Sequence, residues 1–151
     1  RFQVEQCIYK NIMMVNDYGH HPTEVRSTIV TVREGWPSRR LCLVFQPHRY
    51  SRTQALMKAF VSVLAMVDVL ILLPVYASGE TAIVGVNSEG LASEIKRKSG
   101  QHFPEVYTPA LSEVATLLPR IVQEKDIVLF QGAGNIATLA AQISQNWTVK
   151  A

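Results

Sequence analysis

The sequence predicts an α/β fold of three layers, in which a mostly parallel sheet of about six strands is covered by helices on both faces. Short apolar runs alternate with segments of helical periodicity along the chain. Residues 67–73, interrupted only by Asp68 and ended by Pro74, are typical of a strand buried on both faces of a parallel sheet. The length of 151 residues suits one domain, so we expect a single unit with right-handed crossovers over residues 1–151.

The expected elements alternate between strand and helix after an initial pair of strands. We find no internal repeat, low-complexity segment or interdomain linker. In chain order, we expect strands over residues 2–9, 12–15, 40–45, 67–73, 103–107 and 126–131, and helices over residues 23–33, 51–66, 87–98, 109–123 and 136–145.

Local signals support the elements of the N-terminal half. Residues 10–11 suit the tip of a hairpin. Pro22 presets the backbone at the start of the first helix, and Glu24 lies in its first turn. Ser51 followed by Gln54 fits a capping box at the start of the second helix. The inward face of that helix is expected to comprise Ala55, Leu56, Ala59, Phe60, Val63 and Leu64.

The C-terminal half has similar boundaries. Asn87 is a suitable cap for the third helix, and Gly100 is a suitable stop. Pro119 should kink the fourth helix or end it early, because proline lacks the amide proton that a helix interior needs. Residues 132–135 then turn from the last strand into the last helix.

Composition excludes several function classes. The net charge is only +3, and no aromatic residues interleave a basic stripe, so nucleic acid is not an expected partner. No apolar stretch reaches the roughly 20 residues of a membrane span, and we see no signal peptide. Cys7 and Cys42 lie in apolar runs without metal-binding spacing, which favours buried thiols and a cytoplasmic protein.

The first candidate site follows the strand at residues 40–45, where the sequence reads FQPHRYSRT and a helix begins. In α/β sheets, ligands bind at the carboxyl ends of the strands. Within a first helical turn, Arg49 and Arg52 share a face, as do His48 and Arg52. Two guanidinium groups on one patch suit a carboxylate or a phosphate. The alternative is a solvated helix start with two surface arginines.

The second candidate site is the loop NDYGHHP, which also follows a strand and precedes a helix. It offers Asp17, Tyr18, His20 and His21, and Gly19 lets the backbone bend. We expect it to lie at the same sheet edge as FQPHRYSRT if the two preceding strands are parallel neighbours, which would make one polar ligand site. The alternative is that Asp17 caps the next turn and the histidines are ordinary exposed loop residues.

Two further patterns are weaker. Asp17, His20 and His21 have spacings that suit a metal ion, but no further ligand is near in sequence, so we expect no metal site. Gly132, Gly134 and Ala137 match a dinucleotide fingerprint, G-x-G-x-x-A. The chain ends before the acidic residue that the fingerprint requires, so we interpret this segment as a tight turn from strand to helix.

Taken together, these segments resemble the C-terminal domain of the Mur ligase family, across essentially the whole chain. The resemblance is closest to the members that attach L-alanine to UDP-N-acetylmuramate. The segments that carry it are NDYGHHPTEVRSTI (residues 16–29), VFQPHRYSRT (44–53), VYASGE (75–80) and QGAGNI (131–136), in the order of the family, with Arg1 and Phe2 resembling the tail of an Arg-Arg-Phe segment.

The resemblance implies a Rossmann-like domain of an ATP-dependent amide ligase in peptidoglycan precursor synthesis. In the family, ATP phosphorylates the substrate carboxylate, and the amino group of L-alanine attacks the acyl phosphate. N-terminal UDP-sugar and central ATP-binding domains, the latter with the phosphate loop and the Mg²⁺ ligands, complete the enzyme and are absent from this chain. The third domain closes over ATP and contributes to the amino-acid pocket.

Carried over by motif, the family roles give two groups of residues. Arg1 and Asp17 would contact the nucleotide. Arg49 and Arg52 would hold the carboxylate of alanine. This agrees with the argument above that two guanidinium groups on one patch suit a carboxylate. The same pocket would be lined by Tyr18, His20 and His48.

One departure from the family pattern concerns Asn16, which replaces the first Asp of the usual DDYGHHP and leaves Asp17 as the carboxylate of that loop. We expect no ligase activity from this chain alone. Two alternatives remain at this stage: an autonomous module that binds an anionic ligand without catalysis, and a dinucleotide-dependent oxidoreductase. The latter would need a ribose-binding acid and more chain.

Overall fold

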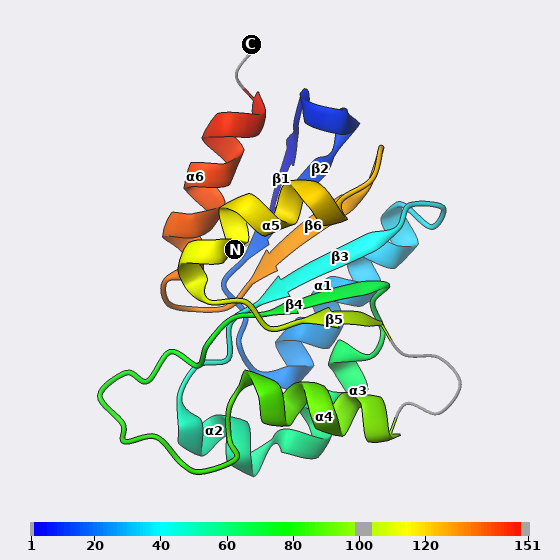
Figure 1. Ribbon diagram of the computed structural model, residues 1–151. Coiled ribbons are helices and arrows are strands. Elements are labelled where there is room, and N and C mark those ends of the chain that lie inside the picture. The colour runs from blue at the N-terminus through cyan, green and yellow to red at the C-terminus, as the bar shows by residue number, and fades with distance from the viewer. Residues whose placement is uncertain (1, 99–103, 149–151) are drawn as a thin grey trace.

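The computed structural model describes residues 2–98 and 104–148, which form a six-stranded sheet. The strand order is β1-β2-β6-β3-β4-β5, as the labels in Figure 1 show. Only β1 runs antiparallel, against β2, and the other neighbours are parallel. The strands are β1 (Gln3–Gln6), β2 (Met13–Asp17), β3 (Leu41–Phe45), β4 (Val69–Leu72), β5 (Glu105–Tyr107) and β6 (Ile127–Gln131).

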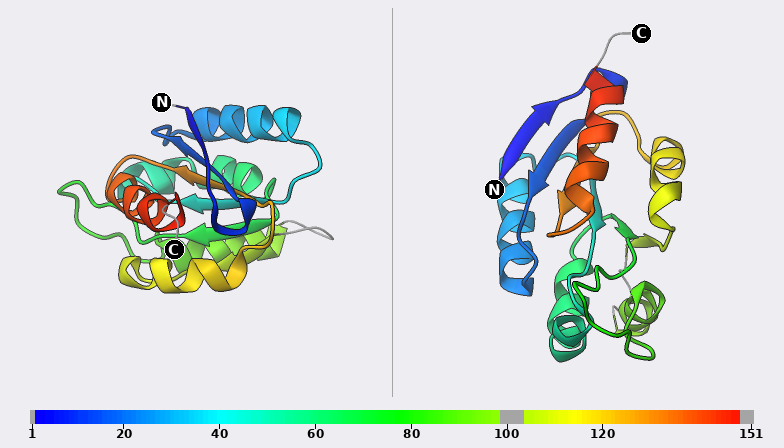
Figure 2. Two further views of the ribbon diagram at one scale, coloured as in Figure 1. Left: turned by 90° about the horizontal axis from the view of Figure 1, so that it is seen from above. Right: turned by 90° about the vertical axis from the view of Figure 1, so that its left-hand side faces the viewer.

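Helices cover both faces of this sheet, so the predicted α/β fold of three layers is confirmed. Side chains of α1, α3 and α4 belong to one hydrophobic cluster, and those of α5 and α6 belong to the other. Figure 2 shows α1 and α5 on opposite sides of the strands. The helices are α1 (Pro22–Gly35), α2 (Tyr50–Ala55), α3 (Met57–Leu64), α4 (Ser88–Lys98), α5 (Val114–Ile121) and α6 (Ile136–Thr148).

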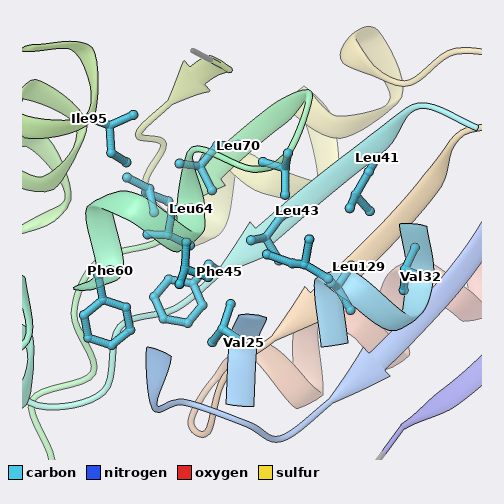
Figure 3. Packing of buried hydrophobic residues seen from close by; sticks show 14 of the residues in the cluster. Val25, Val32, Leu41, Leu43, Phe45, Phe60, Leu64, Leu70, Ile95 and Leu129 are labelled. Carbon is cyan, nitrogen blue, oxygen red and sulfur yellow. The ribbon is translucent and has the colours of Figure 1, made fainter. Parts of the chain in front are cut away.

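The core explains why the strand sequences are apolar at successive positions. In β3, all five residues are buried, with Leu41, Leu43 and Phe45 on one face and Cys42 and Val44 on the other. Figure 3 shows the first face, where leucine, valine and phenylalanine side chains from strands and helices interlock. Burying whole side chains of this kind stabilises the fold by about 1.5–3 kcal/mol each.

The position of β6 determines how the candidate loops are arranged. The last strand in sequence lies between β2 and β3, with Asp17 opposite Gln131 and Gln131 opposite Phe45. Because these strands are parallel, their carboxyl ends share one edge of the sheet. Figure 1 shows α2 and the long loop between β4 and α4 beside this edge.

The segment after β3 differs from the prediction of one long capped helix. It forms two short helices separated at Leu56. The capping box is wrong, because α2 starts at Tyr50 and the Ser51 side chain donates to Glu80 of another loop. Because the helical register changes at the break, Ala55 and Ala59 are exposed instead of facing the core.

Smaller differences occur at other element ends. The first strand stops at Gln6, and residues 9–11 form a 3₁₀ turn, with positive φ at Lys10 and Asn11. The helix that contains Pro119 is preceded by a 3₁₀ turn, Leu111–Glu113, and ends at Ile121. The last helix extends to Thr148, beyond the expected end.

Other boundaries agree with the prediction. The Asn87 side chain accepts a hydrogen bond from the Gly90 amide and so caps α4. Gly100 and Phe103, named above as a helix stop and a strand start, lie outside the described residues. Both cysteines are buried free thiols, and no helix in the described residues is long and apolar enough to cross a membrane.

Candidate functional site

The two polar loops meet at the carboxyl edge of the sheet. The ring centroids of His20, from the loop after β2, and His48, from the loop after β3, are 5.4 Å apart. The two preceding strands are parallel but are not neighbours, because β6 separates them. The prediction that both loops share one rim is therefore confirmed, although the condition attached to it, that the two strands are neighbours, is not met.

Asp17 is fixed by hydrogen bonds at the end of β2. Its Oδ1 accepts from the Gly19 amide at 2.9 Å, and its Oδ2 accepts from the Thr28 hydroxyl of α1 at 2.9 Å. The capping role considered for Asp17 is therefore present. These bonds fix the orientation of the carboxylate at the carboxyl end of β2.

The two adjacent histidines have different surroundings. His21 is the N-cap of α1, and its Nδ1 accepts from the Thr23 amide at 3.2 Å. Glu24 completes a capping box by accepting from the amides of His21 and His20, each at 3.0 Å, and these bonds lower the pKa of Glu24. His21 therefore serves the helix start, while the ring of His20 lies beside His48.

Gln131, which the sequence argument did not select, links the loops through the end of β6. Its side chain is buried, and the side-chain amide donates to the Gly19 carbonyl at 3.0 Å. The backbone carbonyl of Gln131 accepts from the Gln46 backbone amide at 3.2 Å. A Cβ atom on Gly19 would lie 2.7 Å from Nε2 of Gln131, so this loop requires glycine for close packing. Only the register of β6 between the two strands could have revealed Gln131.

The arginines of FQPHRYSRT surround His48. Arg52 Nη1 lies 3.0 Å from His48 Nδ1 and 3.2 Å from the His48 carbonyl, so the predicted contact four positions apart is present. Burial, followed by the charges of His20, Arg52 and Arg49, lowers the pKa of His48. The imidazole is therefore neutral near pH 7, with Nδ1 as the acceptor of the Arg52 bond.

Neither arginine of this turn forms a salt bridge within the described residues, although the charge of Arg49 helps to lower the pKa of Glu80. Within residues 2–98 and 104–148, the salt bridges involve other residues, and neither Arg49 nor Arg52 forms one. Arg49 is exposed and Arg52 is partly exposed. Two positive charges are therefore available to an anionic ligand. The same exposures also agree with the alternative interpretation, a solvated helix start with two surface arginines.

A third segment, the loop between β4 and α4, completes the site. The Tyr76 ring stacks on His48 with centroids 5.4 Å apart and planes 15° apart. In the same loop, Glu80 accepts from the amide of Ser51 at 3.0 Å and from its hydroxyl. VYASGE was noted for its resemblance to the family, but nothing in its spacing assigned it to this site.

The turn at residues 132–135 packs as tightly as expected. A Cβ atom on Gly132 would lie 2.8 Å from the Gln46 carbonyl oxygen, and one on Gly134 would lie 2.9 Å from the Tyr76 ring. The Gln46 side chain accepts from the Ile136 amide at 3.1 Å at the start of α6. These contacts support the interpretation of a close-packed turn.

Two hollows flank the loop that contains Asp17 and Tyr18. One, of about 590 Å³, lies over the start of α1 and includes His20 and Thr28 in its wall. The other, of about 250 Å³, lies between β1, β2 and α6 and includes Gly132. Tyr18 lines both and is 58% exposed, so its ring is open to a ligand from either side.

Arg1 lies outside the described residues. Among the described residues, no group of three or more His, Cys, Asp or Glu side chains is arranged to hold a metal ion.

Comparisons with known proteins identify the relatives of this chain. The family model described as Mur ligase, glutamate ligase domain, matches residues 1–134. A UDP-N-acetylmuramate–L-alanine ligase from Baumannia cicadellinicola subsp. Homalodisca coagulata is 45% identical over 145 residues, which are 95% of this chain and 29% of the relative. The chain therefore spans less than a third of that protein.

Solved structures show the same fold. The UDP-N-acetylmuramate-alanine ligase of Thermotoga maritima matches 91% of this chain and 27% of its own, with a TM-score of 0.70 and 26% identity. A murein peptide ligase from Psychrobacter arcticus matches 97% of this chain and 29% of its own, with a TM-score of 0.69. At 13% identity, the latter supports the fold alone.

Proposed function

The chain belongs to the Mur ligase family, and from this premise we propose that it is the C-terminal domain of an ATP-dependent ligase. The proposed enzyme joins L-alanine to UDP-N-acetylmuramate during peptidoglycan precursor synthesis in the cytoplasm. The observation that carries the proposal is the meeting of His20 with His48 and Arg52 at one sheet edge, which two loops far apart in sequence supply.

In this proposal, the arginines bind the carboxylate of L-alanine. Arg49 and Arg52 form no salt bridge within the described residues, and guanidinium groups hold carboxylates through paired hydrogen bonds. Neutral His48 leaves the positive charge on the arginines and fixes Arg52 through Nδ1. Tyr18 and His20 would line the same pocket from the other loop.

The nucleotide is assigned to the neighbouring positions. We propose that Asp17, held by Gly19 and Thr28, accepts from a hydroxyl of ATP, and that Arg1 contacts the same nucleotide. Within the part of the chain that the structure describes, no group of three or more His, Cys, Asp or Glu side chains is arranged to hold a metal ion. We assign the magnesium ligands to a central domain of the complete enzyme, together with the phosphate loop.

In the proposed reaction, ATP phosphorylates the carboxylate of UDP-N-acetylmuramate, and the amine of alanine attacks the acyl phosphate. The contribution of this domain is to orient the amino acid and to close on the nucleotide. Holding the nucleophile in position lowers the entropic part of the barrier. The N-terminal and central domains would supply the other reactant and the phosphate cradle.

The direct test is ligation by the full-length protein. With ATP, magnesium, UDP-N-acetylmuramate and L-alanine, we expect phosphate release that depends on all three substrates and a product that contains alanine. The isolated chain of 151 residues should show no turnover. Turnover by the isolated chain, or full-length activity without L-alanine dependence, would contradict the proposal.

A further inference from the structure

Arg49 has a backbone conformation that residues with side chains rarely adopt. Its φ is 72° and its ψ is 138°, in a region that mainly glycine occupies. Such strain persists only where the surrounding structure enforces it, and it is concentrated at functional sites. The strained residue here is one of the two proposed carboxylate-binding arginines.

Backbone hydrogen bonds hold Arg49 on both sides. Its amide donates to the Tyr76 carbonyl at 2.8 Å, and its carbonyl accepts from the amide and hydroxyl of Thr53 at 3.2 and 2.8 Å. The Tyr76 amide in turn donates to the Pro47 carbonyl at 2.8 Å. The loop between β4 and α4 therefore forms a short parallel bridge in which Tyr76 pairs with His48, the residue before Arg49.

Glu80 of the same loop fixes the next turn. Arg49, at the N-cap of α2, makes no side-chain capping bond. Instead, Glu80 accepts from the amide and hydroxyl of Ser51, and these bonds lower the pKa of Glu80. A carboxylate from a distant segment thus supplies the cap that the helix lacks.

We propose that Glu80 is a positioning residue for the amino-acid site, which holds the start of α2 so that Arg49 keeps its strained backbone and presents its guanidinium together with Arg52. This proposal rests on the proposed function for the identity of the ligand. Glu80 acts through Ser51, whose amide and hydroxyl both donate to its carboxylate, and the charge of Arg49 adds a weaker direct attraction.

The experiment compares Glu80→Ala, Glu80→Gln and Ser51→Ala in the full-length ligase. We expect Glu80→Ala to raise the KM for L-alanine about tenfold, as the loss of charge-assisted hydrogen bonds implies, with the KM for ATP little changed. Glu80→Gln keeps an acceptor for Ser51 and should restore most of the affinity. Ser51→Ala removes one of the two bonds and should give an intermediate KM.

The KM values of these three variants for L-alanine distinguish a positioning role of Glu80 from direct contact with the substrate. If Glu80 bound the ammonium group of alanine, Glu80→Gln would be as defective as Glu80→Ala and Ser51→Ala would be silent, which would overturn the proposal. An unchanged alanine KM in Glu80→Ala would also overturn it. Glu34→Ala is the matched control, because this exposed glutamate lies at the far end of α1.

A second readout does not depend on catalysis. Amide hydrogen exchange of the full-length protein should show faster exchange at Arg49 and Ser51 in Glu80→Ala, and normal exchange in Glu34→Ala. If the unmodified protein ligates no alanine, the proposed function fails while this readout still tests the positioning role. Unchanged exchange at both amides would contradict the positioning role itself.

Discussion

The edge of the sheet at the amino ends of the strands and the edge at their carboxyl ends differ in how charged side chains are paired. At the amino edge, Asp126 accepts from Arg40 through three hydrogen bonds of 2.8–3.2 Å and from the Gln123 amide. Asp68, before β4 at the same edge, accepts from Arg33 and from the Leu41 amide. These carboxylates are each matched by a cation and a backbone donor.

The carboxyl edge contains the opposite arrangement. Arg49 and Arg52 form no ion pair in the described part of the chain, and Arg49 has a strained backbone. His48 is flanked by cations that lower its pKa. The amino edge therefore contributes to stability, whereas the carboxyl edge keeps two arginines outside any described salt bridge, as proteins commonly do at functional sites.

The largest expected effect concerns the stability of the amino edge. Asp126 is 2% exposed, and Asp126→Ala would leave Arg40 and the Gln123 amide without their acceptor. Breaking a buried pair costs about 3–5 kcal/mol, and the lower end applies because Arg40 is partly exposed. Urea denaturation measures this loss. Glu124→Ala, at an exposed neighbouring position, is the control. A similar loss of unfolding free energy in both variants would show that the buried Asp126–Arg40 pair has no special role in stability.

The next effect concerns binding at the carboxyl edge. Arg52→Ala in the full-length ligase should raise the KM for L-alanine far more than that for ATP, because losing a charged hydrogen-bond partner costs about 1.5–3 kcal/mol. Its unfolding free energy should change much less than that of Asp126→Ala. Steady-state kinetics with each substrate varied in turn provides the test. A larger change in the KM for ATP would show that the arginine assignment is wrong.

A smaller effect concerns pH. Because the folded-state pKa of His48 lies below the unfolded value near 6.5, its contribution to stability is present above pH 6.5 and is lost as the pH falls through the folded pKa. Titration of the His48 ring by NMR should give a midpoint below 6.5. In Arg52→Ala the midpoint should rise, because one cation has been removed. A midpoint at or above 6.5 in the unmodified protein would contradict this account.

The smallest effect concerns Asn16, which lies near the end of β2 opposite Gln3 of β1. Asn16→Asp would add a carboxylate to the hollow that Glu5 and Asp17 also line. The repulsion at this partly exposed position should lower the unfolding free energy on the order of 0.5 kcal/mol. The loss should shrink at high salt, which urea denaturation at two ionic strengths would detect. A gain in stability would show that the family carboxylate has a partner here.

The sequence predicted the sheet class and the elements from apolar runs such as the one in β3, because burial on both faces leaves a strong local pattern. It also predicted that His48 and Arg52 would converge, since that contact depends only on spacing along one turn. It did not predict Gln131 or Glu80 at the site, because their roles depend on strand order and on a loop that crosses from β4. The roles of Arg49 and Arg52 in binding remain predictions.

The strand order also has a consequence for biosynthesis. A ribosome releases β6 only after both site loops have emerged, yet β6 must enter between β2 and β3 before those loops can meet. Until then, the edges of β2 and β3 that pair with β6 have no partner strand. Nothing yet holds the loops of His20 and His48 next to each other. Ligand recognition should therefore appear late, in one step, when the final strand docks, and a nascent chain that stops before Ile127 should lack it.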